Sequence, residues 1–188
     1  QVSLKVPEGT LLPETYNYKF GDTRNSILVR MQKEMVLFVQ KELEKRRIDL
    51  PLKSKEDVII LASIIEKEAG LDSEREIIAS VFVNRLNKKM KLQSDPTVRY
   101  GVSSLVDNKR LTHKDLNRET THNTYRIHGL PPTPICNPSK ASIIAALSPA
   151  STDFFYFVAN GLGGHFFSKT LKEHNQNVAK WRKVRSRL

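Results

Sequence analysis

Residues 61–70 place an acidic side chain where a helix normally presents a core residue. At about 100° per residue, Leu61, Ile64 and Glu68 follow the i, i+3, i+7 spacing and share one stripe of a helix. A carboxyl held against apolar side chains is poorly hydrated, which raises its pKa towards the range of a general acid. The pattern therefore predicts a buried helix with Glu68 as a candidate catalytic acid.

The same residues allow a structural explanation of this acid. Gly70 suits the left-handed position that ends a helix, so Glu68 can reach solvent past that end or pair with a cation such as Arg85. Glu66 lies well off the apolar stripe and is the fallback acid. Helical phase therefore predicts that Glu68 is enclosed and Glu66 is comparatively solvated.

Apolar periodicity and turn residues predict helices and one hairpin along the chain. A full capping box at residues 73–76 is expected to begin the third helix, and Pro96 is expected to keep Asp95 extended. A stiff, proline-rich stretch at 129–135 could form a rigid wall of a cleft. The helices are expected at 25–47, 54–69, 73–87, 139–148 and from 172 onward, the hairpin at 154–158 and 165–168, and a short strand at 123–127.

These elements predict one α+β domain, in which a helical hairpin carries Glu68 and a small antiparallel sheet lines a cleft. A leading loop and long helix occupy residues 1–53, and the catalytic core occupies residues 54–188. No stretch approaches the roughly 18 to 20 apolar residues that span a bilayer. The chain begins at Gln1, which is compatible with a processed or excised product.

Charge and motif content narrow the classes of function. Lys and Arg number 31 against 20 Asp and Glu, a net charge of +11 that favours polyanions or anionic surfaces. The basic clusters are not interleaved with stacking aromatics, so no nucleic-acid partner is expected. The five histidines have no HExxH spacing, and the chain has no P-loop or G-x-G-x-x-G, so neither a metal nor a cofactor is expected. Cys136 has no evident neighbouring base.

Loops rich in hydrogen-bonding groups accompany the acid. Such polar surfaces with aromatic edges suit a carbohydrate, although each residue alone is equally typical of a turn or cap. The candidates for holding a sugar are Gln93, Ser94, Asp95, Asn123 and Tyr125, with Glu66 beside the catalytic position.

Motifs spread over residues 8 to 185 resemble those of the YceG-like, or MltG-type, endolytic murein transglycosylases. They occur in order and with plausible spacing, so their combination is specific. The motifs are ASIIEKE at 62–68, ASVFVNRL at 79–86, LQSDPTV at 92–98 with YG at 100–101, NTY at 123–125, GLPP at 129–132, YFVA at 156–159, GGH at 163–165 and HN at 174–175.

The resemblance implies a fold, a reaction and a place of action. The second Glu of the E-K-E run, here Glu68, corresponds to the family's catalytic acid, in agreement with the helical phase. The family cleaves the β-1,4 bond between N-acetylmuramic acid and N-acetylglucosamine inside glycan strands and leaves a 1,6-anhydromuramyl end. One carboxyl then acts as acid and afterwards as base, without a cofactor.

Full-length members of the family have an N-terminal transmembrane helix and a LysM-like region, neither of which is recognised in this sequence. The resemblance implies action at the outer face of the bacterial cytoplasmic membrane, on peptidoglycan glycan strands and near peptidoglycan synthases. Membrane association would come only through the missing anchor. Rival interpretations are a hydrolytic muramidase with Asp95 or Glu14 as second carboxylate, and an inactive peptidoglycan-binding scaffold.

Overall fold

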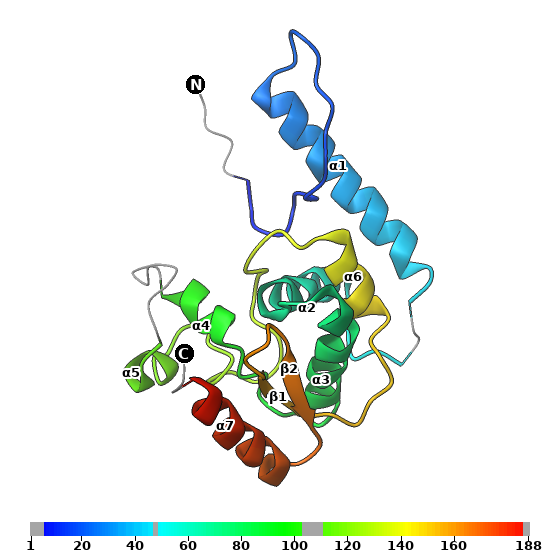
Figure 1. Cartoon of the computed structure of the whole chain (residues 1–188). Coiled ribbons are helices and arrows are strands. Elements are labelled where there is room, and N and C mark those ends of the chain that lie inside the picture. The colour runs from blue at the N-terminus through cyan, green and yellow to red at the C-terminus, as the bar shows by residue number, and fades with distance from the viewer. Residues whose placement is uncertain (1–5, 47–48, 103–110, 186–188) are drawn as a thin grey trace.

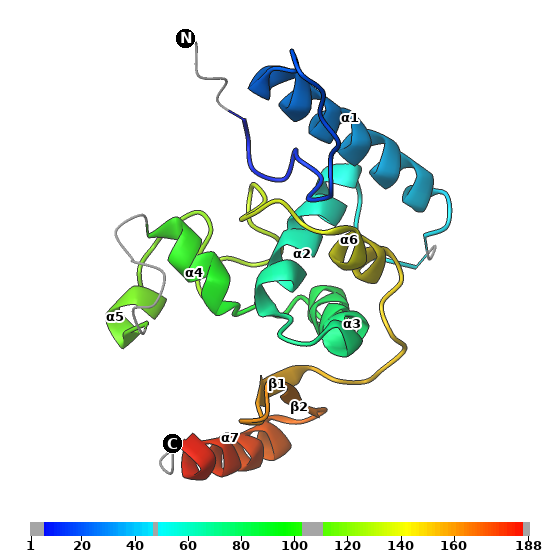
Figure 2. The ribbon, with the colours of Figure 1, turned by 45° about the horizontal axis from the view of Figure 1, so that its top comes forward.

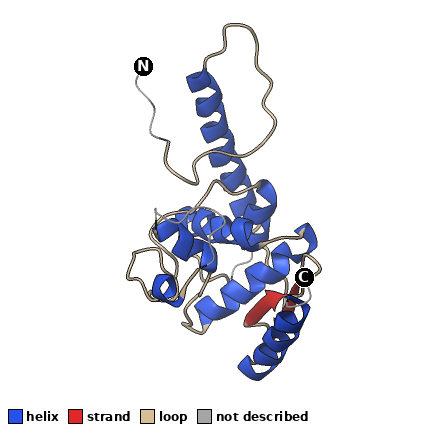
Figure 3. Ribbon diagram, turned by 60° about the vertical axis from the view of Figure 1, so that its left-hand side comes forward, coloured by secondary structure: helices blue, strands red, loops and turns tan. Residues whose placement is uncertain are grey.

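The computed structural model describes residues 6–46, 49–102 and 111–185. Helices dominate this part of the chain, and two strands form one small antiparallel sheet (Figures 1 and 3). The α+β class predicted from the sequence is confirmed. In chain order the elements are α1 Arg24–Leu43, α2 Lys55–Glu68, the 3₁₀ turn η1 Asp72–Glu74, α3 Arg75–Asn87, α4 Asp95–Gly101, α5 His113–Leu116, α6 Lys140–Leu147, β1 Tyr156–Ala159, β2 His165–Ser168 and α7 Leu171–Arg185.

Helix α1 extends from one side of the molecule (Figures 1 and 3). Thr23 begins it with a capping box, in which its side chain accepts from the Ser26 backbone and Ser26 accepts from the Thr23 backbone. Among the residues of α1, only Met35 and Val39 are buried. These two side chains attach one stripe of the helix to the core. The helix ends at Leu43, earlier than the predicted boundary at 47, because the residues after Leu43 form a turn.

Helix α2 lies at the centre of the fold, and α1, α3, α4 and α6 all pack against it (Figure 2). Its middle turns are apolar on most sides, as expected of a helix surrounded by other elements. Each fully buried Leu or Ile side chain contributes about 1.5–3 kcal/mol, so burial holds α2 firmly in the core. Its buried residues are Val58, Ile60, Leu61, Ala62, Ser63, Ile64 and Ile65.

The connection between α2 and α3 differs from the prediction. Gly70 is not among the residues with positive φ, so it does not form the left-handed helix end. Its role is close approach, because a Cβ on Gly70 would lie 2.8 Å from the carbonyl oxygen of Gly163. The predicted capping box at 73–76 is also wrong: η1 leads directly into α3, and Glu74 makes no side-chain cap bond.

The β-hairpin and α7 form a layer beside α3 (Figure 2). Phe157 pairs with Phe167 and Ala159 with His165 in the antiparallel register. Phe157 meets Phe82 of α3 edge-on, with ring centroids 5.9 Å apart, which attaches the sheet to the core. Both strands also contact α7, and the predicted hairpin and C-terminal helix are confirmed.

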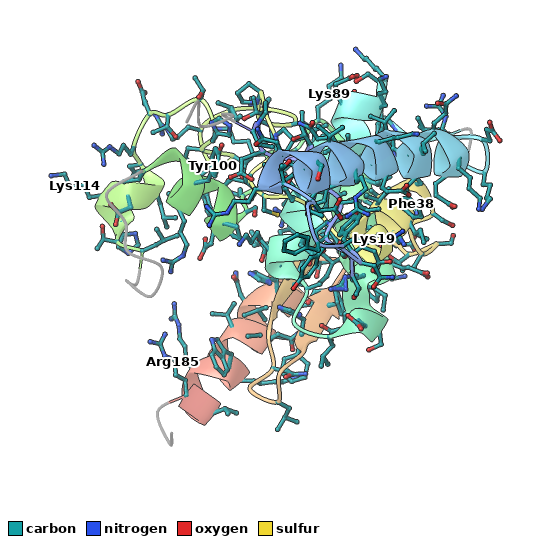
Figure 4. The ribbon with its side chains drawn as sticks, turned by 90° about the horizontal axis from the view of Figure 1, so that it is seen from above. Lys19, Phe38, Lys89, Tyr100, Lys114 and Arg185 are labelled. Carbon is teal, nitrogen blue, oxygen red and sulfur yellow. The ribbon has the colours of Figure 1, made fainter. Side chains whose placement is uncertain are left out.

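No helix in the three described stretches is long and apolar enough to cross a membrane. The labelled cations Lys19, Lys89, Lys114 and Arg185 lie on separate parts of the chain (Figure 4). The basic charge is therefore distributed over several elements.

Candidate active site

Glu68 ends α2 with its carboxyl turned to the protein. The Ser94 hydroxyl donates a 2.6 Å hydrogen bond to its Oε1. Although the residue as a whole is only half-buried, loss of hydration dominates at the carboxyl and raises its pKa to about 7. Asp95 adds to the rise, whereas Ser94 and Arg85 oppose it. At neutral pH this carboxyl is poised to give up or take a proton.

A pocket of about 400 Å³ opens beside Glu68. Its volume suits a small ligand or one to two sugar rings of a longer chain. Strand β1 contributes three consecutive residues, so the small sheet forms one wall. The lining residues are Glu68, Arg85, Leu92, Gln93, Asp95, Tyr125, Phe157, Val158, Ala159, His165 and His174.

Gln93 and Ser94 approach Glu68 from the segment before α4. The Gln93 backbone has φ +50° and donates to the Thr124 carbonyl, while the Ser94 backbone donates to Thr124 Oγ1. Thr97 and Thr124 share a buried hydroxyl contact of 2.8 Å. These bonds fix the Ser94 hydroxyl against the carboxyl, which the sequence could suggest but not place.

Asp95 and Tyr125 meet at the rim of the pocket. The Tyr125 hydroxyl donates a 2.7 Å bond to Asp95 Oδ1, and burial and the Asp95 charge raise the Tyr125 pKa. The prediction that Pro96 keeps Asp95 extended is wrong: Asp95 is the first residue of α4, where a proline in the first turn costs no hydrogen bond. The structure thus brings together Gln93, Ser94, Asp95 and Glu68.

Asn123 is not in the pocket. It is 1% exposed, and its amide donates to the carbonyls of Leu116 and Arg118 while its Oδ1 accepts from the Tyr125 backbone. The strand predicted at 123–127 is wrong, because these bonds make a turn. Asn123 therefore holds the backbone of Tyr125 in place, and its buried side chain cannot contact a ligand in this arrangement.

Glu66 also lies outside the pocket. Its Oε2 accepts bonds from the Ser139 backbone, the Ser139 hydroxyl and the Ser142 hydroxyl, at 3.1, 2.6 and 2.6 Å. Burial acts to raise its pKa, but these hydrogen bonds outweigh burial and lower it. Glu66 is thus held by residues at the start of α6. Its carboxyl is less enclosed than that of Glu68, as the helical phase predicted, and Glu68 faces the pocket.

The proline-rich segment 129–135 does not line the pocket. Its end crosses α2, where the Ile135 backbone donates to Ser63 Oγ and the Cys136 thiol to the Ser63 carbonyl. Burial raises the pKa of the Cys136 thiol to about 11, so it stays protonated at neutral pH. The stiff segment therefore covers part of helix α2 and does not form a wall of the pocket.

Arg85 is a pocket residue that the sequence suggested only as a counter-ion. Its guanidinium donates to the carbonyls of Phe155 and Leu92, each at 2.7 Å, and lies over the Tyr156 ring. It thereby joins α3 to the hairpin and to the Ser94 segment. Its charge still acts on Glu68, lowering that carboxyl's pKa as one of the smaller influences.

His165 and His174 complete the wall opposite α2, and sequence reasoning gave neither a role. His174 stacks on Tyr156, and burial and Arg85 lower its pKa, so the ring is neutral. Both histidines lie in motifs that carried the family resemblance, GGH at 163–165 and HN at 174–175. That signal could have marked them, but not their positions. Among the described residues no group of three or more His, Cys, Asp or Glu side chains could hold a metal ion.

Known proteins with similar sequences carry a consistent description. An endolytic murein transglycosylase of Bacillus subtilis (strain 168) is 42% identical over 184 residues, which cover 95% of this chain and 49% of that protein. The endolytic murein transglycosylase of Streptococcus pneumoniae (strain D39) is 32% identical over 178 residues, covering 92% and 32%. This chain thus spans about half or less of these relatives.

A solved structure and a family profile agree with these relatives. The crystal structure of a putative yceG-like protein from Listeria monocytogenes superposes with a TM-score of 0.77 at 42% identity, covering 89% of this chain and 54% of that one. The profile of the YceG-like family matches residues 1–180. The chain belongs to the YceG-like family.

Proposed function

We propose that this chain is the catalytic part of an endolytic lytic transglycosylase that acts on peptidoglycan glycan strands. The observation that carries the proposal is Glu68, a carboxyl with its pKa raised to about 7 beside a polar and aromatic pocket. The relatives of this chain that are named endolytic murein transglycosylases support the proposal. We assign the chemistry to residues 54–188, since these include every pocket-lining side chain.

In the first step, protonated Glu68 gives its proton to the glycosidic oxygen between N-acetylmuramic acid and N-acetylglucosamine. The bond from that oxygen to the muramyl C1 breaks, and positive charge develops on the sugar. A carboxyl with a pKa near the working pH combines a populated acid form with a strong tendency to release its proton. Desolvation supplies this property to Glu68.

In the second step, the Glu68 carboxylate takes the proton of the muramyl C6 hydroxyl while that oxygen attacks C1. The product is a 1,6-anhydromuramyl end, and Glu68 is protonated again for the next cycle. The Ser94 hydrogen bond and the Arg85 charge both favour the carboxylate, so they stabilise Glu68 between the two steps. Asp95, with Tyr125 bonded to it, adds negative charge near the developing cation.

Hydrolysis by two carboxylates is the second candidate, and one observation favours it. Asp95 lines the same pocket as Glu68, and its charge raises the Glu68 pKa. Glu14, the other proposed second carboxylate, pairs with Lys140 on α6 and is not among the pocket residues. A muramidase would therefore use Asp95 to activate water or to attack C1.

The site of action follows from the proposed substrate. We place it at the outer face of the bacterial cytoplasmic membrane, where new glycan strands and the peptidoglycan synthases meet. The net charge of +11 would assist contact with anionic lipid or wall polymer, an attraction that added salt should weaken.

The deciding experiment is mass spectrometry of glycan strands digested by the wild type, Glu68→Gln and Glu66→Gln. New anhydromuramyl ends produced by cleavage within long strands support the transglycosylase, whereas new reducing ends identify a muramidase. Glu68→Gln should lose roughly 10² to 10⁴ of the rate, the usual contribution of a general acid. Glu66→Gln is the matched control and should cleave. Full cleavage by Glu68→Gln refutes the assignment, and glycan binding without cleavage by the wild type favours a scaffold.

A further inference from the structure

His165 is held by a carboxylate that belongs to the connection directly after α2. Glu74 Oε1 accepts the His165 backbone N–H at 2.8 Å, and Glu74 Oε2 contacts His165 Nδ1 at 2.7 Å. The side chains of both residues are largely enclosed, at 13% and 14% exposed. This two-point contact fixes the ring in position and in rotation.

The contact also fixes which nitrogen carries the proton. A carboxylate oxygen only accepts hydrogen bonds, so Nδ1 is the donor in this contact, and in the uncharged form of the imidazole Nε2 is then the acceptor. Nε2 has no hydrogen-bond partner within the described part of the chain, and it is not among the buried atoms left unpaired there. Because His165 lines the pocket, this acceptor is accessible to a ligand.

The position of the ring relative to Glu68 is set by further close contacts. Gly70 passes so near the Gly163 carbonyl that a Cβ would lie 2.8 Å from it, and a Cβ on Gly164 would lie 2.6 Å from Glu74 Oε1. Phe157 packs against the imidazole in a T-shaped arrangement, with ring centroids 5.3 Å apart and planes at 84°. The chain that leaves Glu68 is therefore tied to the wall that carries His165.

We propose that His165 Nε2 is a substrate contact, accepting a hydrogen bond from a hydroxyl of the sugar bound beside Glu68. The proposal rests on the proposed function. It adds a hydrogen-bonding contact for the sugar on the wall of the pocket opposite α2. His174 is not equivalent, because its Nδ1 is enclosed without a partner and its ring face is covered by Tyr156. Glu74 acts through His165 and is a positioning residue.

An isosteric change at Glu74 separates positioning from packing. In Glu74→Gln the side-chain oxygen must stay at the His165 backbone N–H, which needs an acceptor, and this places the amide NH₂ beside Nδ1. An NH₂ group donates, so the proton of the ring moves to Nε2 and the acceptor in the pocket is lost. The shape of the side chain is almost unchanged.

The test measures binding of a GlcNAc–MurNAc tetrasaccharide by calorimetry in the non-cleaving Glu68→Gln protein. Adding His165→Phe or Glu74→Gln should weaken binding about tenfold, the effect of one lost hydrogen bond. Adding His165→Gln should preserve most of the affinity, because the amide donates to Glu74 and its oxygen replaces Nε2. His113→Gln, at an exposed histidine of α5, is the matched control. Side-chain ¹⁵N spectra should show the Nδ1–H tautomer of His165, replaced by Nε2–H in Glu74→Gln.

Equal affinity in the Glu74→Gln protein, with the tautomer changed as expected, overturns the proposal. So does an Nε2–H tautomer in the protein that keeps Glu74. If His165→Phe does not fold, the comparison of His165→Gln with Glu74→Gln decides. Failure of the proposed function gives a different result: a muramidase leaves reducing ends, a scaffold binds the tetrasaccharide although the wild type cleaves no glycan, and a protein with another substrate binds no tetrasaccharide in its Glu68→Gln form.

Discussion

The Ser94 hydroxyl donates a 2.6 Å hydrogen bond to Glu68 Oε1, and this bond opposes the effect of burial on the same carboxyl. Burial wins, because the Glu68 pKa is still raised to about 7. In Ser94→Ala the opposing bond is absent, so the Glu68 pKa should rise further. The alkaline limb of the pH–rate profile should move to higher pH, and the maximal rate should fall about tenfold, since the carboxyl also loses an orienting partner.

The measurement for Ser94→Ala is the pH dependence of anhydromuramyl product formation. Ser151→Ala, at an exposed serine, should leave the profile in place. A limb that moves to lower pH, or does not move, would contradict the assignment of that limb to Glu68.

Helical phase was enough to distinguish Glu68 from Glu66 in the E-K-E run, because the spacing of apolar residues within α2 itself shows which face of the helix is buried. Leu61, Ile64 and Ile65 are all 0% exposed, and Glu68 follows them into the pocket. The environment of Glu66 was not predictable in this way. Its partners Ser139 and Ser142 come from α6, far along the chain, and only the tertiary fold brings them to α2.

The errors around the pocket have local causes that sequence patterns do not resolve. Asn123 is typical of both a sugar ligand and a turn, and here its side-chain bonds make the turn. Gly70 suits a left-handed helix end, but its value in this fold is the absence of a Cβ. His165 was overlooked, and Arg85 was expected only as a counter-ion, because their partners, Glu74 and a backbone carbonyl, lie on other elements.

Burial of Glu68 should make the stability of the protein depend on pH. Its folded pKa of about 7 lies above the ordinary value of 4.5, so the stabilising preference for the protonated form is complete below about 4.5 and is lost as pH rises through 7. Removing the charge in Glu68→Gln should therefore stabilise the protein at pH 8, by up to about 3 kcal/mol. Urea unfolding at pH 4 and pH 8 measures this difference.

The gain in Glu68→Gln should vanish at pH 4, where the wild-type carboxyl is protonated in both states. Glu8→Gln, at an exposed carboxyl, should show no such dependence. Equal stability of the wild type and Glu68→Gln at pH 8 would mean that Glu68 is well hydrated.

Glu66 should behave in the opposite sense. Its pKa is lowered, so the stability it contributes is present at neutral pH and is lost as pH falls through the lowered value. Glu66→Gln should destabilise the protein by about 1–3 kcal/mol at pH 7, because the three bonds from Ser139 and Ser142 converge on one oxygen and a neutral amide oxygen is a weaker acceptor there than a carboxylate. The deficit should shrink in acid, and cleavage of glycan should persist. Loss of cleavage in a stably folded Glu66→Gln protein would return Glu66 to the list of candidate acids.

The close approach of Gly70 to Gly163 makes a prediction about pocket geometry. Gly70 does not have positive φ, so alanine is tolerated by its backbone, but the Cβ would meet the Gly163 carbonyl at 2.8 Å. Gly70→Ala should therefore push the hairpin away from α2, with a loss of about 1–3 kcal/mol in stability and a higher KM for glycan. Gly129→Ala is the informative comparison: it has φ +80° and open space, so it should lose stability through backbone strain yet keep KM. Unfolding and steady-state cleavage of both variants give the answer, and an unchanged KM in Gly70→Ala would show that the spacing of the two walls does not control substrate binding.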